Sequence, residues 1–135
     1  MKTLIFLLLF ITSTSFCQNK DAIEVRTKLI HKWNLEQFEE VERKDGMTTI
    51  YKTKYAENVT FEFKKDETLE VVYSDSRIEN YTWKITKRYI EILPSNNLNF
   101  NAEISGTFEI YFLHKILQLF LQRKNDPHHG IMLKK

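Results

Sequence analysis

Residues 59–71 read Val59-Thr60-Phe61-Glu62-Phe63-Lys64-Lys65-Asp66-Glu67-Thr68-Leu69-Glu70-Val71, with apolar and polar side chains alternating on both sides of Asp66-Glu67. A period of two is typical of a β-strand with one buried face. The interruption at Asp66-Glu67 indicates a turn. This stretch therefore predicts two strands joined by a tight connection.

The same alternation recurs along most of the chain. Asp21 to His31 has the apolar spacing of a short helix, and Asp45-Gly46 is typical of a hairpin turn. Pro94 to Ala102 is rich in Asn and predicts a loop. Further strands are expected at Lys32–Glu42, Met47–Tyr55, Tyr81–Ile85, Ile90–Ile92, Phe108–Phe112, on the Leu117, Leu119 and Leu121 face, and at Ile131–Leu133. About nine short strands in succession predict an all-β fold, either a meander closed into a barrel or a sandwich.

The N-terminus has the composition of a secretory signal peptide. Lys2 precedes the apolar run Leu4–Ile11, which is followed by Thr12-Ser13-Thr14-Ser15-Phe16-Cys17. The run is shorter than the roughly 20 residues needed to cross a bilayer. We therefore expect residues 1–17 to be a signal peptide, residues 18–135 to be one mature domain, and the protein to be secreted or periplasmic.

Two forms of processing are compatible with this segment. Ser15 and Cys17 are small residues at the positions that ordinary cleavage before Gln18 requires. The alternative is a lipoprotein anchored to a membrane through acylated Cys17, although Phe16 is bulky for such a signal. Cleavage after Cys17 would leave no cysteine, so packing alone would hold the mature domain together.

The charge balance argues against a nucleic-acid-binding protein. Of the 20 basic residues only Lys2 lies in residues 1–17, which leaves 19 basic against 18 acidic residues in the mature domain. The two signs are mixed and form no basic block, whereas nucleic-acid binding requires a basic face. We expect a monomer that contacts a membrane only if Cys17 is acylated.

Catalytic and metal-binding patterns are weak. His128-His129 are adjacent, so in a strand they point to opposite faces and are poorly placed to ligate one metal. Asp75 and Glu79 form a candidate acid–base pair only if the structure brings them together. The serines have no nucleophile-elbow spacing, and three glycines do not make a phosphate-binding loop. We expect no enzymatic activity, no metal and no cofactor.

Eight aromatic residues share the inward parity of their strands: Trp33, Phe61, Phe63, Tyr73, Tyr81, Trp83, Phe108 and Phe112. They either fill the interior, as in small barrels, or line a cavity for a mostly apolar ligand. In the second interpretation Tyr73, Tyr81, Trp83 and Phe112 are the candidate ligand-binding residues, with the tyrosine hydroxyls orienting the ligand.

The chain resembles the lipocalin-like proteins, small secreted β-barrels of the Bacteroidetes type. Leu29–Leu35 occupies the place of the family's G-x-W element, Phe63–Leu69 resembles its F-x-x-D-G-T segment, Tyr81–Ile85 its central tryptophan strand, and Phe108–Leu113 with Leu117–Leu119 its closing pair. His31 and Glu67 replace glycines of these motifs. The resemblance implies a single antiparallel up-and-down β-barrel of about 8–9 strands, preceded by a short N-terminal helix.

The resemblance also implies a contact that closes the barrel. In the family a basic residue of a late strand packs across the first-strand tryptophan, and Arg123 and Trp33 are the matching residues here. Two functions remain open. One is a binding module for a small apolar or amphipathic ligand, and the other is a filled barrel that acts as an interaction or inhibitor domain through its surface, with the Pro94–Ala102 loop as the candidate surface.

Overall fold

The structure is a computed structural model that describes residues 21–44, 46–53, 58–96, 99–126 and 129–135. Within these ranges it contains one short helix (residues 21–29) and nine strands. The strands are β1 (Lys32–Lys44), β2 (Met47–Thr53), β3 (Thr60–Phe63), β4 (Thr68–Val72), β5 (Ile78–Thr86), β6 (Tyr89–Pro94), β7 (Gly106–Leu113), β8 (Gln118–Arg123) and β9 (His129–Lys134).

The strands form one antiparallel sheet that closes on itself. Neighbours from β3 to β9 pair in chain order, β3 pairs with β1, and β9 pairs back with β1. Strand β2 pairs with the far half of β1, Phe38–Lys44, whereas β3 pairs with the near residues Lys32–Asn34. Because β2 and β3 follow one another along the same edge of β1, the barrel has eight strand positions.

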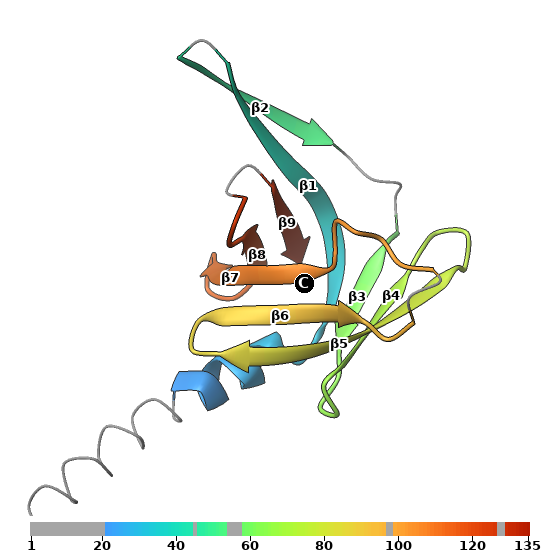
Figure 1. The fold of residues 1–135 in the computed structure, drawn as a ribbon. Helices are drawn as coiled ribbons and strands as arrows, with labels where there is room; N and C mark the ends of the chain where they lie inside the picture. The colour runs from blue at the N-terminus through green and yellow to red at the C-terminus, as the bar shows by residue number, and fades with distance from the viewer. Residues whose placement is uncertain (1–20, 45, 54–57, 97–98, 127–128) are drawn as a thin grey trace, which may run out of the picture.

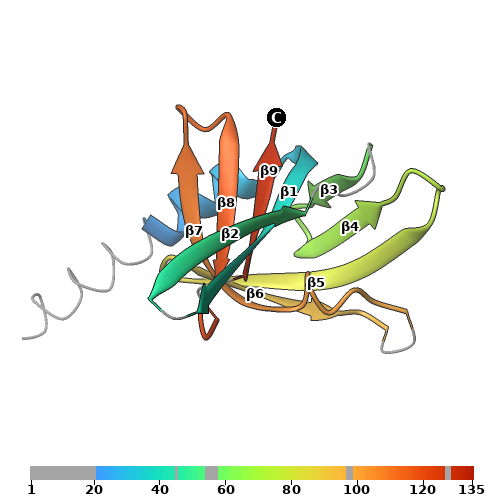
Figure 2. The same cartoon turned by 90° about the horizontal axis from the view of Figure 1, so that it is seen from above.

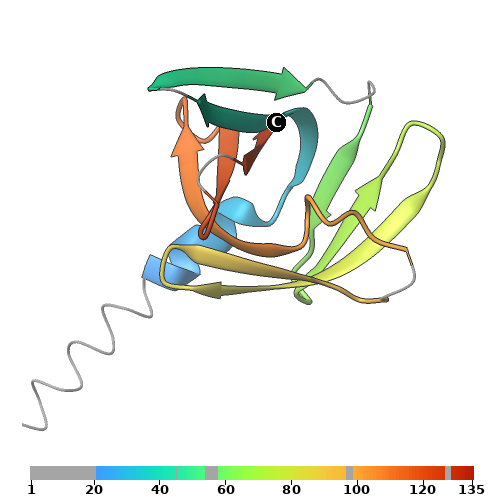
Figure 3. The same ribbon diagram turned by 45° about the horizontal axis from the view of Figure 1, so that its top comes forward.

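The predicted all-β antiparallel barrel with a short N-terminal helix is therefore confirmed. Figure 1 shows the β1–β2 hairpin reaching beyond the barrel wall and the helix lying at the opposite side of the molecule. Figures 2 and 3 show β7, β8 and β9 on one side of the barrel and β3, β4 and β5 on the other. No helix in the described ranges is long and apolar enough to cross a membrane.

Element boundaries differ from the predicted ones by a few residues. The helix ends at residue 29, β1 continues to Lys44, and Pro94 belongs to β6. The end of the predicted strand Met47–Tyr55 lies outside the described residues, as do Asp45 and His128 and the whole predicted signal peptide. Leu117 does not share the inward face of Leu119 and Leu121. It is 59% exposed because residues 114–116 form a left-handed turn before β8 begins.

The turn between β3 and β4 has a left-handed backbone at Glu67, the position where the family motif has a glycine. Glu67 adopts a φ of 66°, which an L-residue adopts at a cost. Asp66 stabilises the turn, because its Oδ1 accepts hydrogen bonds from the backbone N and the Oγ1 of Thr68. These hydrogen bonds lower the pKa of the Asp66 carboxyl.

The core consists of the predicted inward-facing side chains. Trp33, Phe61, Phe63, Tyr81, Trp83 and Phe108 are each no more than 2% exposed, whereas Tyr73 and Phe112 are half-buried. Full burial of a large apolar side chain contributes about 1.5–3 kcal/mol to the free energy of unfolding. The aromatic residues thus pack against one another and against the aliphatic core of the opposite strands.

The helix covers one end of the barrel, which we call the helix end. Leu29 is fully buried there, and its carbonyl accepts a hydrogen bond of 3.0 Å from Trp33 Nε1. Arg26 lies 4.9 Å from the centre of the Trp83 ring and donates to Glu67 Oε1 at 2.9 Å. These contacts fasten the helix to the start of β1 and to the β3–β4 turn.

The opposite end carries the β4–β5 turn (residues 73–77) and the segment 99–105, and we call it the loop end. Arg123 holds this segment by donating to the carbonyl oxygens of Ala102, Glu103 and Ser105 at 3.0, 3.0 and 2.8 Å. Its guanidinium lies 4.9 Å from the Phe108 ring. Arg123 thus closes the end of the barrel that the helix does not cover.

The predicted contact between Arg123 and Trp33 is wrong. Arg123 pairs across the ladder with Phe108 at the loop end, whereas Trp33 lies at the helix end beside Phe61. The cation above Trp33 is Lys135, whose Nζ lies 5.5 Å from the ring, because Lys134 pairs with Asn34. The register of the ladders therefore gives each residue a different partner.

Candidate functional site

Glu79 is the single buried charged side chain in the described ranges outside residues 37–53, with an exposed fraction of 5%. It faces inward because β5 alternates strictly, and Glu79 shares the parity of Tyr81 and Trp83. Burying a carboxylate is costly unless hydrogen bonds compensate it. The surroundings of Glu79 therefore identify the place where this barrel departs from an apolar core.

Two tyrosine hydroxyls supply those hydrogen bonds. Tyr73 donates to Glu79 Oε2 at 2.9 Å, and Tyr81 donates to the same oxygen at 2.6 Å. The Tyr81 oxygen in turn accepts from the backbone N of Asn101 at 3.0 Å. The loop-end segment, β5 and the end of β4 thus meet in one polar cluster.

Both tyrosines are protonated at neutral pH. Burial, together with the hydrogen bond to Glu79, raises the pKa of Tyr73 to about 12. The pKa of Tyr81 is raised further, again first by burial and then by its hydrogen bond to Glu79. Each hydroxyl therefore acts as a donor, and neither is prepared to act as a base.

Arg77 lies over the rim of this cluster. The backbone N of Tyr73 donates to the Arg77 carbonyl at 2.9 Å, which closes the β4–β5 turn. The guanidinium then lies 4.1 Å from the Tyr73 ring, 3.9 Å from Glu79 Oε1 and 4.0 Å from Asp75. Asp75 and Glu79 thus share one guanidinium instead of forming an acid–base pair of their own.

A pocket of about 380 Å³ opens beside Glu79. The side chains that line it come from the β4–β5 turn, from the start of β5 and from the loop-end segment: Arg77, Ile78, Glu79, Asn99 and Phe100. Ile78 and Phe100 are 54% and 42% exposed, so apolar surface adjoins the buried carboxylate. This pocket, with the Tyr73–Glu79–Tyr81 cluster behind it, is the candidate functional site.

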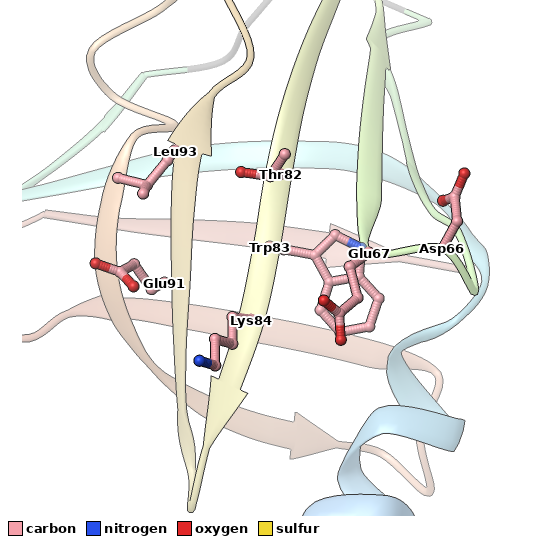
Figure 4. Close-up of a pocket in the computed structure, with 7 residues that line it drawn as sticks. All are labelled: Asp66, Glu67, Thr82, Trp83, Lys84, Glu91 and Leu93. Atoms are coloured by element: carbon pink, nitrogen blue, oxygen red, sulfur yellow. The ribbon is translucent and has the colours of Figure 1, made fainter.

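A second pocket, of about 300 Å³, lies on the outside of the barrel (Figure 4). Its walls are the β3–β4 turn and neighbouring residues of β5 and β6: Asp66, Glu67, Thr82, Trp83, Lys84, Glu91 and Leu93. Figure 4 shows Lys84 and Glu91 on adjacent strands, where they are register partners. Its charged groups are exposed, and Glu67 already pairs with Arg26. It is the weaker candidate.

The structure divides the four predicted ligand-binding residues between the two ends of the barrel. Tyr73 and Tyr81 meet at Glu79, at the loop end. Trp83 lies at the helix end, where its Nε1 donates to the Thr68 carbonyl at 2.9 Å. Phe112 lies there too, 5.9 Å from Lys28 Nζ.

Reasoning from the sequence alone did not assign the lining of the loop-end pocket, because Glu79 was considered only as an acid–base partner of Asp75 and Phe100 only as part of the Pro94–Ala102 loop. Arg77 and Phe100 lie in turns and loops, whose side chains carry no periodic signal. Glu79, by contrast, lies in a strand with a periodic signal, because it has the same parity as Tyr81 and Trp83. No group of three or more His, Cys, Asp or Glu in the described part of the chain is placed to hold a metal ion.

Comparison with solved structures identifies a similar barrel. The chain is similar to a lipocalin-like protein from Bacteroides uniformis ATCC 8492, with a TM-score of 0.51 and 18% sequence identity. The match covers 80% of this chain and 98% of the other. No family model and no curated protein sequence matches the chain. The likeness establishes a lipocalin-like fold.

Proposed function

We propose that this lipocalin-like barrel is a non-catalytic binding module that takes a small apolar or amphipathic ligand at its loop end. The observation that carries the proposal is the pocket of about 380 Å³, in which the apolar side chains Ile78 and Phe100 adjoin a buried carboxylate. Pockets for small molecules combine apolar walls with a few placed polar groups. The volume lies within the range of about 300–1,000 Å³ that such ligands occupy.

The burial of the core aromatics supports a ligand at the mouth of the barrel over one deep inside. Tyr81 and Trp83 are 0% and 2% exposed, and the hydroxyl of Tyr81 already has a protein acceptor in Glu79. A ligand among these rings would have to displace packed side chains, which costs stability. We therefore assign Tyr73 and Tyr81 to support of Glu79, and the contact with the ligand to Phe100 and Ile78.

Binding of an uncharged apolar dye, Nile red, tests the proposal. We expect saturable binding that Phe100→Ser weakens about three- to tenfold, since full burial of an aromatic side chain is worth about 1.5–3 kcal/mol and 42% of Phe100 is left for a ligand to cover. Leu117→Ser is the matched control, because Leu117 is 59% exposed and lies in the β7–β8 turn, away from the pocket. Equal loss in both variants, or no saturable binding, would overturn the assignment.

A second function is favoured by the same packing. The interior aromatics are buried, and Ile78, Leu93 and Phe100 are exposed apolar side chains on β5, β6 and the loop-end segment. A filled barrel could use this surface to contact a protein, as an interaction or inhibitor domain. Absence of dye binding would favour this alternative.

We further propose that the mature domain works outside the cytoplasm. The support is the signal-like composition of residues 1–17, and membrane attachment would follow only from acylation of Cys17.

A further inference from the structure

We propose that the loop-end pocket selects an amphipathic ligand with a cationic head group, such as a protonated alkylamine, whose ammonium binds Glu79. This inference rests on the proposed function and adds to it the chemistry of the head group.

The two oxygens of Glu79 have different surroundings. Oε2 accepts from both tyrosines, whereas Oε1 lies 3.9 Å from Arg77 Nη1, which is beyond hydrogen-bond distance. Every fully buried polar side-chain atom of the described residues has a hydrogen-bond partner. Since Oε1 has none at that distance, it is not fully buried, and Glu79 lines the pocket. The pocket thus offers an acceptor oxygen on a carboxylate that is otherwise buried.

Both tyrosine hydroxyls donate to Oε2 of Glu79, so Oε1 can still accept a hydrogen bond, and a cation is the donor that suits a carboxylate. Tyr73 and Tyr81 already satisfy Oε2, so their donors are not available to a ligand. Hydrogen bonds to an ionised carboxylate are shorter and roughly twice as strong as those between neutral groups. An ammonium that reaches Oε1 would combine such a hydrogen bond with attraction between opposite charges in a partly dehydrated site.

The local charge favours the same sign of ligand. The single guanidinium of Arg77 faces two carboxylates, Asp75 at 4.0 Å and Glu79 at 3.9 Å, which leaves these three groups with one net negative charge. Arg77 is 59% exposed, and exposed pairs of this length are weak. A ligand ammonium can therefore take Glu79 while Arg77 stays beside Asp75 and Tyr73.

The apolar lining accounts for the remainder of the ligand. Ile78 and Phe100 line the same pocket as Glu79 and are 54% and 42% exposed. An alkyl chain that covers them removes apolar surface from water. The outer pocket of Figure 4 has no comparable feature, because its carboxylates are exposed and Glu67 among them already pairs with Arg26.

Three amphiphiles of equal chain length test the head group: decylamine, decanol and decanoate. Their affinities are measured by displacement of Nile red at neutral pH, where an alkylamine, like the lysine side chain with a pKa of about 10.4, is protonated. We expect decylamine to bind about tenfold or more tightly than decanol, and decanoate to bind most weakly. Equal affinities for all three would overturn this inference but leave the proposed function intact. Failure of all three and of the dye would overturn the proposed function itself.

Variants assign the preference to Glu79. Glu79→Gln is expected to remove the difference between decylamine and decanol while dye binding persists. Glu91→Gln, which removes an exposed carboxylate of the outer pocket, is the matched control and should leave the difference unchanged. Arg77→Met keeps Glu79 and removes a positive charge 3.9 Å from its Oε1 that would repel the ammonium, so decylamine should bind several-fold more tightly even if Glu79→Gln does not fold. No gain in Arg77→Met, or an equal loss in Glu91→Gln, would contradict the assignment.

Discussion

The hydroxyl of Tyr81 donates to Oε2 of Glu79 at 2.6 Å, and the two residues stand two positions apart on the same face of β5. One strand therefore supplies both a buried charge and a donor for it. Tyr73 adds a second donor from beyond the end of β4, at 2.9 Å. This arrangement lets a carboxylate sit inside an aromatic core, at the end of the barrel where the pocket opens.

Removal of the Tyr81 hydroxyl should destabilise the fold. In Tyr81→Phe, Oε2 of Glu79 loses its shorter hydrogen bond and the backbone N of Asn101 loses its acceptor. A buried polar group left unsatisfied costs about 1–3 kcal/mol, which urea unfolding would measure as a lower free energy of unfolding. Tyr111→Phe, at an exposed position, should change it by less than about 0.5 kcal/mol. An unchanged midpoint in Tyr81→Phe would show that water replaces the hydroxyl without cost.

Alkaline pH should weaken the fold through Tyr73. The pKa of Tyr73 is about 12 in the folded protein, above its ordinary value of 10.0, because burial disfavours the phenolate. The unfolded chain therefore loses this proton first, so the contribution of Tyr73 is fully present below pH 10 and is lost as pH rises toward about 12. The stability difference between the wild type and Tyr73→Phe should shrink over that interval in urea unfolding. A difference that stays constant from about pH 9 to about pH 11.5 would contradict the raised pKa.

Truncation of Arg123 should loosen the loop end. Arg123→Ala removes three hydrogen bonds to carbonyl groups and the contact with Phe108, and we expect a loss of about 1.5–3 kcal/mol. Arg88→Ala, which removes an exposed pair with Glu109, should cost less than about 1 kcal/mol.

Double-mutant cycles identify the partner of Arg123. Combination with Phe108→Leu should show a coupling of about 0.5–2 kcal/mol, because the guanidinium lies over that ring. Combination with Trp33→Phe should be additive, since Trp33 lies at the helix end. Coupling to Trp33 instead would restore the contact that the family resemblance implied.

Glycine at position 87 should stabilise the β5–β6 hairpin. Lys87 is exposed and adopts a φ of 58° in the two-residue turn between Thr86 and Tyr89. Hairpin turns with positive φ favour glycine, so Lys87→Gly should raise the free energy of unfolding by about 0.5–1 kcal/mol. Lys84→Gly, in the extended part of β5, should lower it by about 0.5–1 kcal/mol. A loss of stability in both variants would mean that residue 87 does not adopt a positive φ in this turn.

Processing of the N-terminus is tested by the intact mass of the exported protein. We expect a chain that starts at Gln18, because Ser15 and Cys17 fit ordinary cleavage. A mass that retains Cys17 with acyl chains would replace the secreted form by the lipoprotein form. A mass that retains residues 1–17 would show that the segment is not a signal peptide.

The sequence by itself determined the strands and their inward faces, whereas alternation left a barrel and a sandwich open and the resemblance to lipocalin-like proteins implied the barrel. Alternation of apolar and polar residues is a local property, because successive side chains of a strand point to opposite faces whatever lies around them. Phe61, Leu69 and Trp83 could therefore be placed in the core from their parity alone. The tertiary structure decided which inward residues meet. Arg123 has the same parity as the inward-facing Leu119 and Leu121, but the register of β7 and β8 places it beside Phe108. The cation that lies over Trp33 is Lys135 instead. Likewise, the pocket beside Glu79 depends on the path of the segment that carries Asn99 and Phe100. Register and loop paths follow from contacts between residues far apart in the chain, for which a period of two carries no information.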